Sequence, residues 1–168
     1  KTAYEVLRSR VVSKREIRDR THAAAYDELR RVAEALHAPV TTSWAGRGVL
    51  PETNALAIPM ALIKLNHQVR NDADLVLVVG SRLSETDWWG KAPYWRHPSE
   101  QKMIQVDIDG HILGANNTAA LAVPADAKLF LAALATELES RKARMNLDLS
   151  VIHISEPTKH LRIPDVGF

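Results

Sequence analysis

The sequence of 168 residues predicts an α/β domain in which helices cover both faces of a parallel sheet. Two observations predict this class. The aliphatic run 75–79 stops at Gly80, which is typical of a strand buried on both faces. Helical and extended patterns alternate along the chain, which favours right-handed crossovers between parallel strands. The length suits one domain with a sizeable core.

The elements before this central strand are a helix, a short strand and a second helix. Residues 25–36 repeat apolar positions with a helical period and are followed by Pro39. Residues 40–42 are typical of a short strand. Three apolar positions on one face indicate the second helix: Leu62, Leu65 and Val69.

Beyond Gly80 the pattern predicts two strands and a final helix. The strands are residues 103–107 and residues 121–123, the second of which is cut by Pro124. Asp126 can cap the helix behind it, because its carboxylate can accept from free amides of the first turn. We expect four apolar residues of this helix to face the sheet: Phe130, Ala133, Leu134 and Leu138. The fold class is therefore a Rossmann-like, three-layer α/β domain.

The composition and charge of the chain exclude some classes of binding partner. The chain is 46% hydrophobic and 25% charged, and it contains no cysteine, which excludes disulfides and agrees with a cytoplasmic location. No apolar run approaches the roughly 20 residues of a membrane span. The net charge of +2 comes from an excess of basic residues within residues 1–20. We therefore expect neither nucleic acid nor membrane as a partner.

Candidate metal and catalytic residues are not indicated by the sequence. The seven histidines have no metal-ligand spacing, and we expect no metal site among them. Asp107 and Asp109 could suggest a cation site, but a turn at Asp109-Gly110 is favoured. We expect no catalytic residue in this chain.

Five segments in order carry a family resemblance: residues 28–36, residues 38–51, residues 73–83, residues 104–109 and residues 125–128. Together they make residues 21 to about 138 resemble the central domain of thiamine-diphosphate-dependent enzymes, the group of acetolactate synthase and benzoylformate decarboxylase. The resemblance implies a DHS-like NAD/FAD-binding fold with six parallel strands in the order 3-2-1-4-5-6. It also implies a homo-oligomeric parent, a lyase or transferase acting on 2-keto acids.

In such a parent, the pyrimidine- and diphosphate-binding domains hold thiamine diphosphate and Mg²⁺, and they are the expected partners of this domain. In some members the central domain itself binds FAD or ADP. The residues that the resemblance implies for that site are Gly80, Ser81, Arg82, Asp107, Ile108, Asp126, Ser43 and Trp44.

The implied roles follow from the chemistry of a nucleotide. Residues 80–82 would approach the phosphates, because amides and a guanidinium suit oxyanions. Asp107 and Ile108 would lie by the adenosine, and Asp126 would lie at the rim. The structural alternative is that Gly80 only turns the chain and that Asp107 caps a local turn. A non-binding spacer and a free-standing FAD-, NAD- or ADP-binding module therefore stay open.

The two ends of the chain depart from the family. Residues 1–20 show scattered charges where the family has an apolar, glycine-ended strand, so we expect the first strand to be missing. A reading-frame error or a foreign helical extension would explain this. Residues 145–168 are expected to be a non-native tail, because residues 149–159 resemble a translated sequencing adaptor. The central domain would then span residues 21–144.

The connection after Gly80 is rich in aromatic residues: Trp88, Trp89, Tyr94 and Trp95. Tryptophan and tyrosine favour interfaces, so we expect this cluster to pack against a neighbouring domain or subunit. The alternative is that the cluster holds a ligand.

Overall fold

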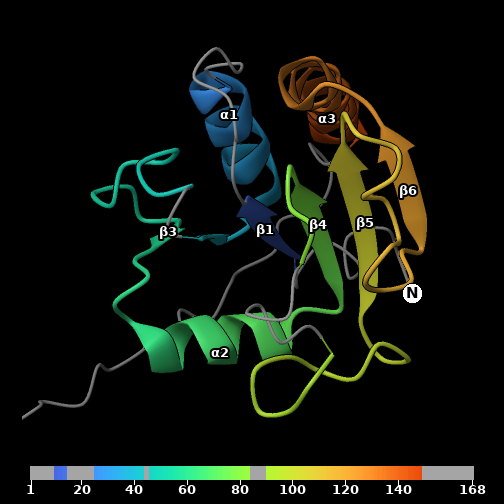
Figure 1. The fold of residues 1–168 in the computed structure, drawn as a ribbon. Coiled ribbons are helices and arrows are strands. Elements are labelled where there is room, and N and C mark those ends of the chain that lie inside the picture. Colours follow the sequence, from blue (N-terminus) through green and yellow to red (C-terminus); the bar gives the residue numbers. More distant parts are fainter. Residues whose placement is uncertain (1–9, 15–24, 44–45, 84–89, 149–168) are drawn as a thin grey trace, which may run out of the picture.

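The computed structural model describes residues 10–14, 25–43, 46–83 and 90–148, and it shows a six-stranded sheet between helices (Figure 1). In chain order the elements are β1 (Arg10–Lys14), α1 (Tyr26–Leu36), β2 (Val40–Thr42), β3 (Ala57–Ile58), α2 (Ile63–Asp72), β4 (Leu75–Val79), β5 (Lys102–Asp107), β6 (Leu121–Pro124) and α3 (Ala127–Asp148). The α/β class and the Rossmann-like arrangement are confirmed.

The sheet is parallel throughout, with the order β3-β2-β1-β4-β5-β6. This is the order that the family resemblance implies. The chain runs outward from β1 to one edge and then crosses to β4, so the order reverses between β1 and β4. Ligands of open α/β sheets bind at such a reversal, outside the carboxyl ends of the strands.

The expectation that the first strand is missing is wrong. Residues 10–14 fill the inner place of the sheet, where Val12 pairs with Val40 on one side and with Leu77 on the other. Backbone groups form a ladder, so five residues suffice to pair both neighbours without a long apolar run. The strand also excludes a helix at these positions. The origin of residues 1–20 as a whole is not tested by this finding.

Helices α1 and α3 lie together on one face of the sheet, and α2 lies on the other (Figure 1). The larger core fills the space beneath α1 and α3, where Leu29 and Val32 of α1 and Leu131 of α3 are fully buried beside Leu77 and Val79 of β4. A second core lies under α2, and it contains the alternate residues of β4, Val76 and Val78, with Met103 and Trp95. Both faces of β4 are therefore covered, as its unbroken aliphatic run predicts.

The sequence of helix α1 accounts for its buried face and for the point where it ends. Its buried residues are Leu29, Val32, Ala33 and Leu36, which is the helical spacing of one apolar face. His37 adopts a left-handed conformation with φ of 47°, and the Ala38 amide bonds back to the Ala33 carbonyl at 2.9 Å. This left-handed cap ends the helix just before Pro39.

The predicted inner faces of the other two helices need correction. In α2 the buried residue is Asn66, whereas Leu62 is 48% and Leu65 39% exposed; Val69 does pack against the second core. Asn66 Nδ2 is satisfied by the carbonyls of Pro59 and Leu62 at 2.8 and 3.0 Å, whereas its buried Oδ1 has no hydrogen-bond partner among the described residues.

In α3 the fully buried residues are Leu131 and Ala135, one position away from the expected set. Phe130, Leu134 and Leu138 pack at the margin of the core, and Ala133 is exposed. The helix is rotated toward α1 because it packs against that helix as well as against the sheet. Among the described residues no helix is both long and apolar enough to span a membrane.

Candidate functional site

The predicted site residues lie at one edge of the sheet. Because all strands are parallel, their carboxyl ends meet at the same edge, and Val79 of β4 is level with Val106 of β5. The register continues from Asp107 of β5 to Pro124 of β6. The structure thus brings together the segments that follow β4, β5 and β6, and Ser43 follows β2 at the same edge. Trp44 lies outside the described residues.

Gly80 turns the chain at the end of β4. Its φ of +64° is a left-handed value that favours glycine, and its amide donates to the Val106 carbonyl at 2.8 Å. Ser81 is buried, and its Oγ accepts from the amide of Leu83 at 3.2 Å. Arg82 is exposed between them. The turn therefore hides Ser81 and presents the Arg82 guanidinium to solvent.

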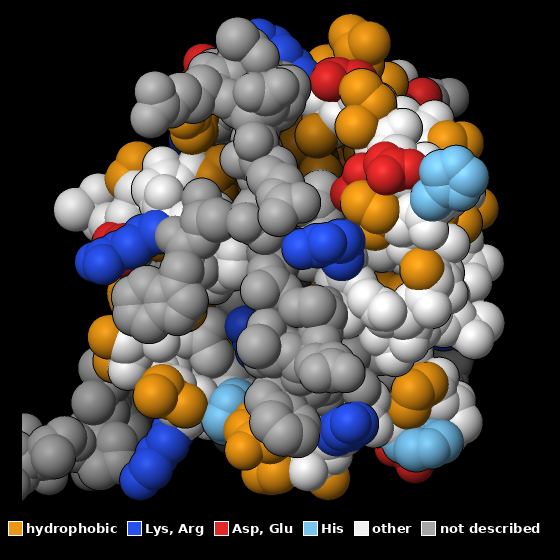
Figure 2. All heavy atoms as spheres, viewed as in Figure 1, with side chains coloured by type: hydrophobic (Ala, Val, Ile, Leu, Met, Phe, Trp, Pro, Cys, Tyr) orange, Lys and Arg blue, Asp and Glu red, His pale blue; other side chains and the backbone are white. Residues whose placement is uncertain are grey.

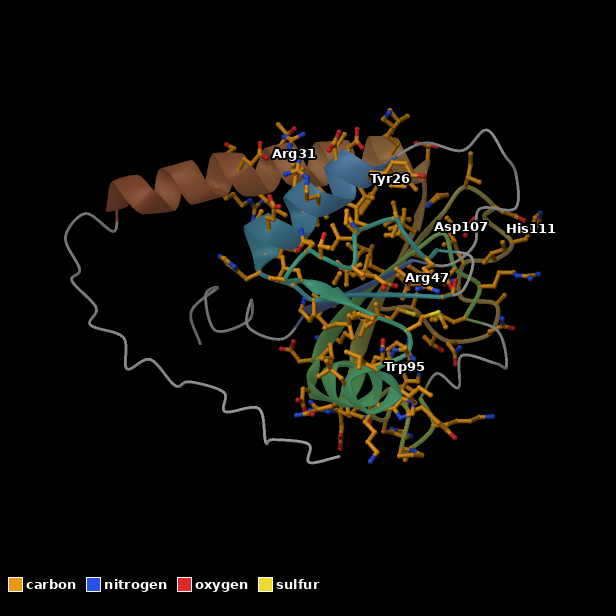
Figure 3. The ribbon with its side chains drawn as sticks, turned by 90° about the vertical axis from the view of Figure 1, so that its left-hand side faces the viewer. Tyr26, Arg31, Arg47, Trp95, Asp107 and His111 are labelled. Atoms are coloured by element: carbon orange, nitrogen blue, oxygen red, sulfur yellow. The ribbon has the colours of Figure 1, made fainter. Side chains whose placement is uncertain are left out.

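Asp107 and Asp109 form two successive side-chain turns after β5. Asp107 Oδ1 accepts from the Asp109 amide at 3.0 Å, and Asp109 Oδ1 accepts from the His111 amide at 2.9 Å. Ile108 is 77% exposed between the two carboxylates. Figure 3 shows Asp107 and His111 at the same end of the sheet. The local role expected for Asp107 in the structural alternative is thus present, and its second carboxylate oxygen is not part of this turn.

Asp126 caps α3 as predicted. Its Oδ1 accepts from the amides of Lys128 and Leu129 at 2.9 and 3.0 Å. Ser43 has a local role as well, because its Oγ accepts from the Gly46 amide at 3.4 Å. Both side chains therefore stabilise the loops of this edge. Their contribution to a ligand site stays a prediction.

The surface near the ends of β5 and β6 combines apolar and acidic side chains. Ile108 and Leu129 are 77% and 72% exposed and lie close in sequence to Asp107 and Asp126. Orange and red atoms adjoin one another over this region in Figure 2. Carboxylates accept hydrogen bonds from hydroxyl groups and repel other negative charges. This surface therefore suits an uncharged, hydroxyl-bearing ring better than it suits an anionic ligand.

Sequence reasoning missed two residues of this edge, Gln105 and Asn116. Gln105 is 2% exposed in β5, and its Nε2 donates to the Ser81 carbonyl at 2.9 Å while its Oε1 accepts from the Gly114 amide at 2.8 Å. Asn116 Nδ2 donates to the Arg82 carbonyl at 2.9 Å. For Gln105 the sequence carries one signal that could have found it, a polar amide side chain in the interior of an otherwise apolar strand.

Two residues of the aromatic cluster, Tyr94 and Trp95, are among the residues that the structure describes. Trp95 is 2% exposed and packs inside the second core, with the Arg70 guanidinium carbon 4.9 Å from its ring centroid. Tyr94 meets His67 edge to face at 4.8 Å. Tyr94 and Trp95 therefore both contact α2 of the same domain, as Figure 3 shows for Trp95. Trp88 and Trp89 lie outside the described residues.

Comparisons with known proteins agree with this architecture. Residues 19–134 match the family model described as "Thiamine pyrophosphate enzyme, central domain". The chain is 31% identical over 153 residues to the "Probable 2-ketoarginine decarboxylase AruI" of Pseudomonas aeruginosa, covering 84% of this chain and 27% of that protein. It is 34% identical over 144 residues to the "Probable acetolactate synthase 2, chloroplastic" of Oryza sativa, covering 82% of this chain and 21% of that protein.

A solved structure has the same fold. It is an X-ray structure assigned as a thiamin diphosphate-dependent enzyme from Mycobacterium smegmatis, with a TM-score of 0.53 and 23% identity. The match covers 80% of this chain and 26% of that one. The chain thus spans about a quarter of the length of the relatives that it matches. By sequence and by fold, the chain belongs to the family of thiamine pyrophosphate enzyme central domains.

Proposed function

We propose that this chain is the central domain of a longer thiamine-diphosphate-dependent enzyme that acts on 2-keto acids, either as an acetolactate synthase-like carboligase or as a decarboxylase. The observation that carries the proposal is the family match over residues 19–134, on a parallel sheet with the strand order that the resemblance implies. The relatives carry this domain as 21% to 27% of their length. A free-standing nucleotide-binding module is therefore not favoured.

Thiamine diphosphate and Mg²⁺ do not fit the part of this chain that the structure describes. The sequence contains no Gly-Asp-Gly metal motif. Within the described ranges no group of three His, Asp or Glu side chains could hold a metal ion. We assign both groups to the pyrimidine- and diphosphate-binding domains of the parent, which are the proposed partners in a cytoplasmic homo-oligomer. The chemistry of the reaction would then come from those domains and their cofactor.

For this domain we propose that the carboxyl edge binds the adenosine diphosphate moiety that ADP and FAD share. Arg82 is exposed after a glycine turn, where a guanidinium can meet a diphosphate. Asp107 offers one carboxylate oxygen to ribose hydroxyls, and the exposed Ile108 offers apolar contact to a base.

A specific observation supports the second candidate, a spacer that binds no nucleotide. The Gly80 amide is already used by Val106, and Oδ1 of both Asp107 and Asp126 already accepts backbone amides. These bonds would exist in a domain whose only task is to hold its neighbours in place.

Calorimetric titration of the 168-residue chain with ADP, FAD and NAD decides between the two. The binding proposal expects saturable binding of ADP and FAD, and a loss of about tenfold in affinity for Arg82→Met because one charged hydrogen bond is removed. Arg47→Met is the matched control, because Arg47 pairs with Glu52 at 3.0 Å and would keep the affinity unchanged. No heat with ADP or FAD would favour the spacer. Sequencing the gene in both directions tests the parent, which must supply the two missing domains.

A further inference from the structure

Two side-chain amides, one in β5 and one in the segment that follows β5, bond to the turn that follows β4. Gln105 donates to the Ser81 carbonyl, and Asn116 donates to the next carbonyl, that of Arg82, each at 2.9 Å. Gln105 also accepts from the Gly114 amide at 2.8 Å. We call Gln105 and Asn116 the amide bridge. It fixes the two consecutive backbone carbonyls that lie on either side of the Arg82 Cα.

The side-chain amide of Gln105 is unfavourable to bury at its position in β5. It is 2% exposed and level with Val78 of β4, on the face of the sheet where Met103 and Val76 form the second core. A buried amide costs free energy unless its donor and its acceptor are both used, and here both are used on loop backbone. An apolar side chain would fill this place without that requirement. The hydrogen bonds of Gln105 thus stabilise the two loops more directly than they stabilise the core.

Asn116 acts from the surface. Its side chain is exposed, but its Nδ2 reaches a carbonyl 34 positions earlier in the chain. Gly114, with φ of +72°, turns the segment between the two bridge residues so that its amide meets Gln105. Residues 81–82 are therefore joined to residues 114–116 directly by the bond of Asn116 and indirectly by the two bonds of Gln105.

We propose that Gln105 and Asn116 are positioning residues for Arg82. By holding the backbone on both sides of Arg82, they fix the direction from which its guanidinium meets the diphosphate of the ligand. This inference rests on the proposed nucleotide site. It adds a testable element, because the bridge can be measured without any ligand.

The first experiment measures amide hydrogen exchange by NMR in the ligand-free chain. Asn116→Ala should raise exchange at Leu83, whose amide donates to Ser81 Oγ within the same turn, by about tenfold, which corresponds to one lost hydrogen bond, while the Gly114 amide stays protected by Gln105. Asn117→Ala, one residue away, is the matched control and should change neither. Unchanged exchange at Leu83 in Asn116→Ala would overturn the bridge.

A second variant separates the two halves of the bridge. Gln105→Met keeps the length of the side chain and removes both of its bonds, so exchange should rise at Leu83 and at Gly114 together. The amide of Val78 in β4 reports whether the core has stayed folded. Equal rises in exchange at Leu83, Gly114 and Val78 would show that Gln105→Met has unfolded the domain. The test of the amide bridge then depends on Asn116→Ala alone, because that substitution lies at the surface.

The third experiment compares ADP with adenosine as ligands. Asn116→Ala should weaken ADP binding about three- to tenfold and leave adenosine binding unchanged, because only the diphosphate meets Arg82. Equal losses for ADP and adenosine would overturn the positioning role in favour of general loop damage. If the wild-type chain binds no ADP, the nucleotide proposal and the positioning role fall together, whereas the exchange result still decides whether the bridge exists.

Discussion

Arg31 of α1 and Glu139 of α3 form a two-point ion pair across the interface of the two helices. Arg31 Nε lies 2.9 Å from Glu139 Oε1, and Nη2 lies 2.7 Å from Oε2. Figure 3 shows Arg31 between the helices. The pair joins residues 108 positions apart, on the outside of the core that α1 and α3 share. It is a tertiary contact that no local pattern could indicate.

The pair predicts a pH dependence of stability. The hydrogen bond from Arg31 lowers the pKa of the Glu139 carboxyl below its ordinary value of 4.5; desolvation opposes this shift and Coulomb attraction to Arg31 adds to it. A carboxylate with a lowered folded-state pKa stabilises the fold above its unfolded-state pKa, and this contribution is lost as the pH falls through the folded-state pKa.

We therefore expect Glu139→Gln to lower the melting temperature slightly at neutral pH, since both side chains are well exposed to solvent. The difference from wild type should shrink once the pH falls below 4.5. Thermal melts by circular dichroism between neutral and acidic pH check this. Glu137→Gln is the control on the same helix, because Glu137 pairs with Arg141 one turn further along α3. A difference that grows on acidification would contradict the prediction.

Gly80 should be sensitive to substitution for conformational reasons. Its φ of +64° is costly for any residue with a Cβ, so Gly80→Ala should lower the free energy of unfolding by about 1 kcal/mol. Gly110→Ala is the matched control, because a Cβ at Gly110 meets nothing within 4 Å and its φ is not left-handed. Urea denaturation of both variants measures the difference, and equal stabilities would refute the strain argument.

Two leucines of α3 test the corrected orientation of that helix. Leu131 is fully buried, so Leu131→Ala should cost about 3 kcal/mol through lost burial and the cavity left behind. Leu129 is 72% exposed, and Leu129→Ala should change stability by less than about 0.5 kcal/mol. Denaturant midpoints of the two variants provide the comparison. Similar costs at both positions would mean that the helix is rotated differently from the structure.

The cap of α3 gives a fourth stability test. Asp126→Ala removes the acceptor of the Lys128 and Leu129 amides and should cost about 1 kcal/mol. Asp126→Asn keeps an acceptor oxygen in the same place and should retain most of the stability. The same denaturation assay applies. A full loss in Asp126→Asn would show that charge, and not the cap bond, is what matters at this position.

Much of the fold could be predicted because its determinants are local. The strand at Val40–Thr42, the central strand at Leu75–Val79 and the cap at Asp126 were each visible as short sequence patterns, and the structure has them in place. The two-residue strand β3 (Ala57–Ile58) was missed, since it is too short to show a period. Strand β1 was missed because pairing on both sides through backbone groups replaced the apolar run expected there.

The candidate site could be predicted only in outline. A glycine after a buried strand marks the edge where ligands bind, and the acidic residues after β5 and β6 fall at the same edge because the strands are parallel. Which bonds these residues make could not be read from spacing. Gln105 and Asn116 reach carbonyls 24 and 34 positions away, and only the register of β4 against β5 brings them there.

The sequence by itself determined the class of fold, the family and the place of most helices and strands, since these depend on hydrophobic period, glycine and proline positions and short polar caps. The tertiary structure decided the rest: that residues 10–14 complete the sheet, that Asn66 and Gln105 are buried, and that α3 turns Leu131 inward. The reason is physical. Burial and pairing depend on which distant segments pack together, and a backbone ladder or a satisfied amide can form with little apolar signal in the chain.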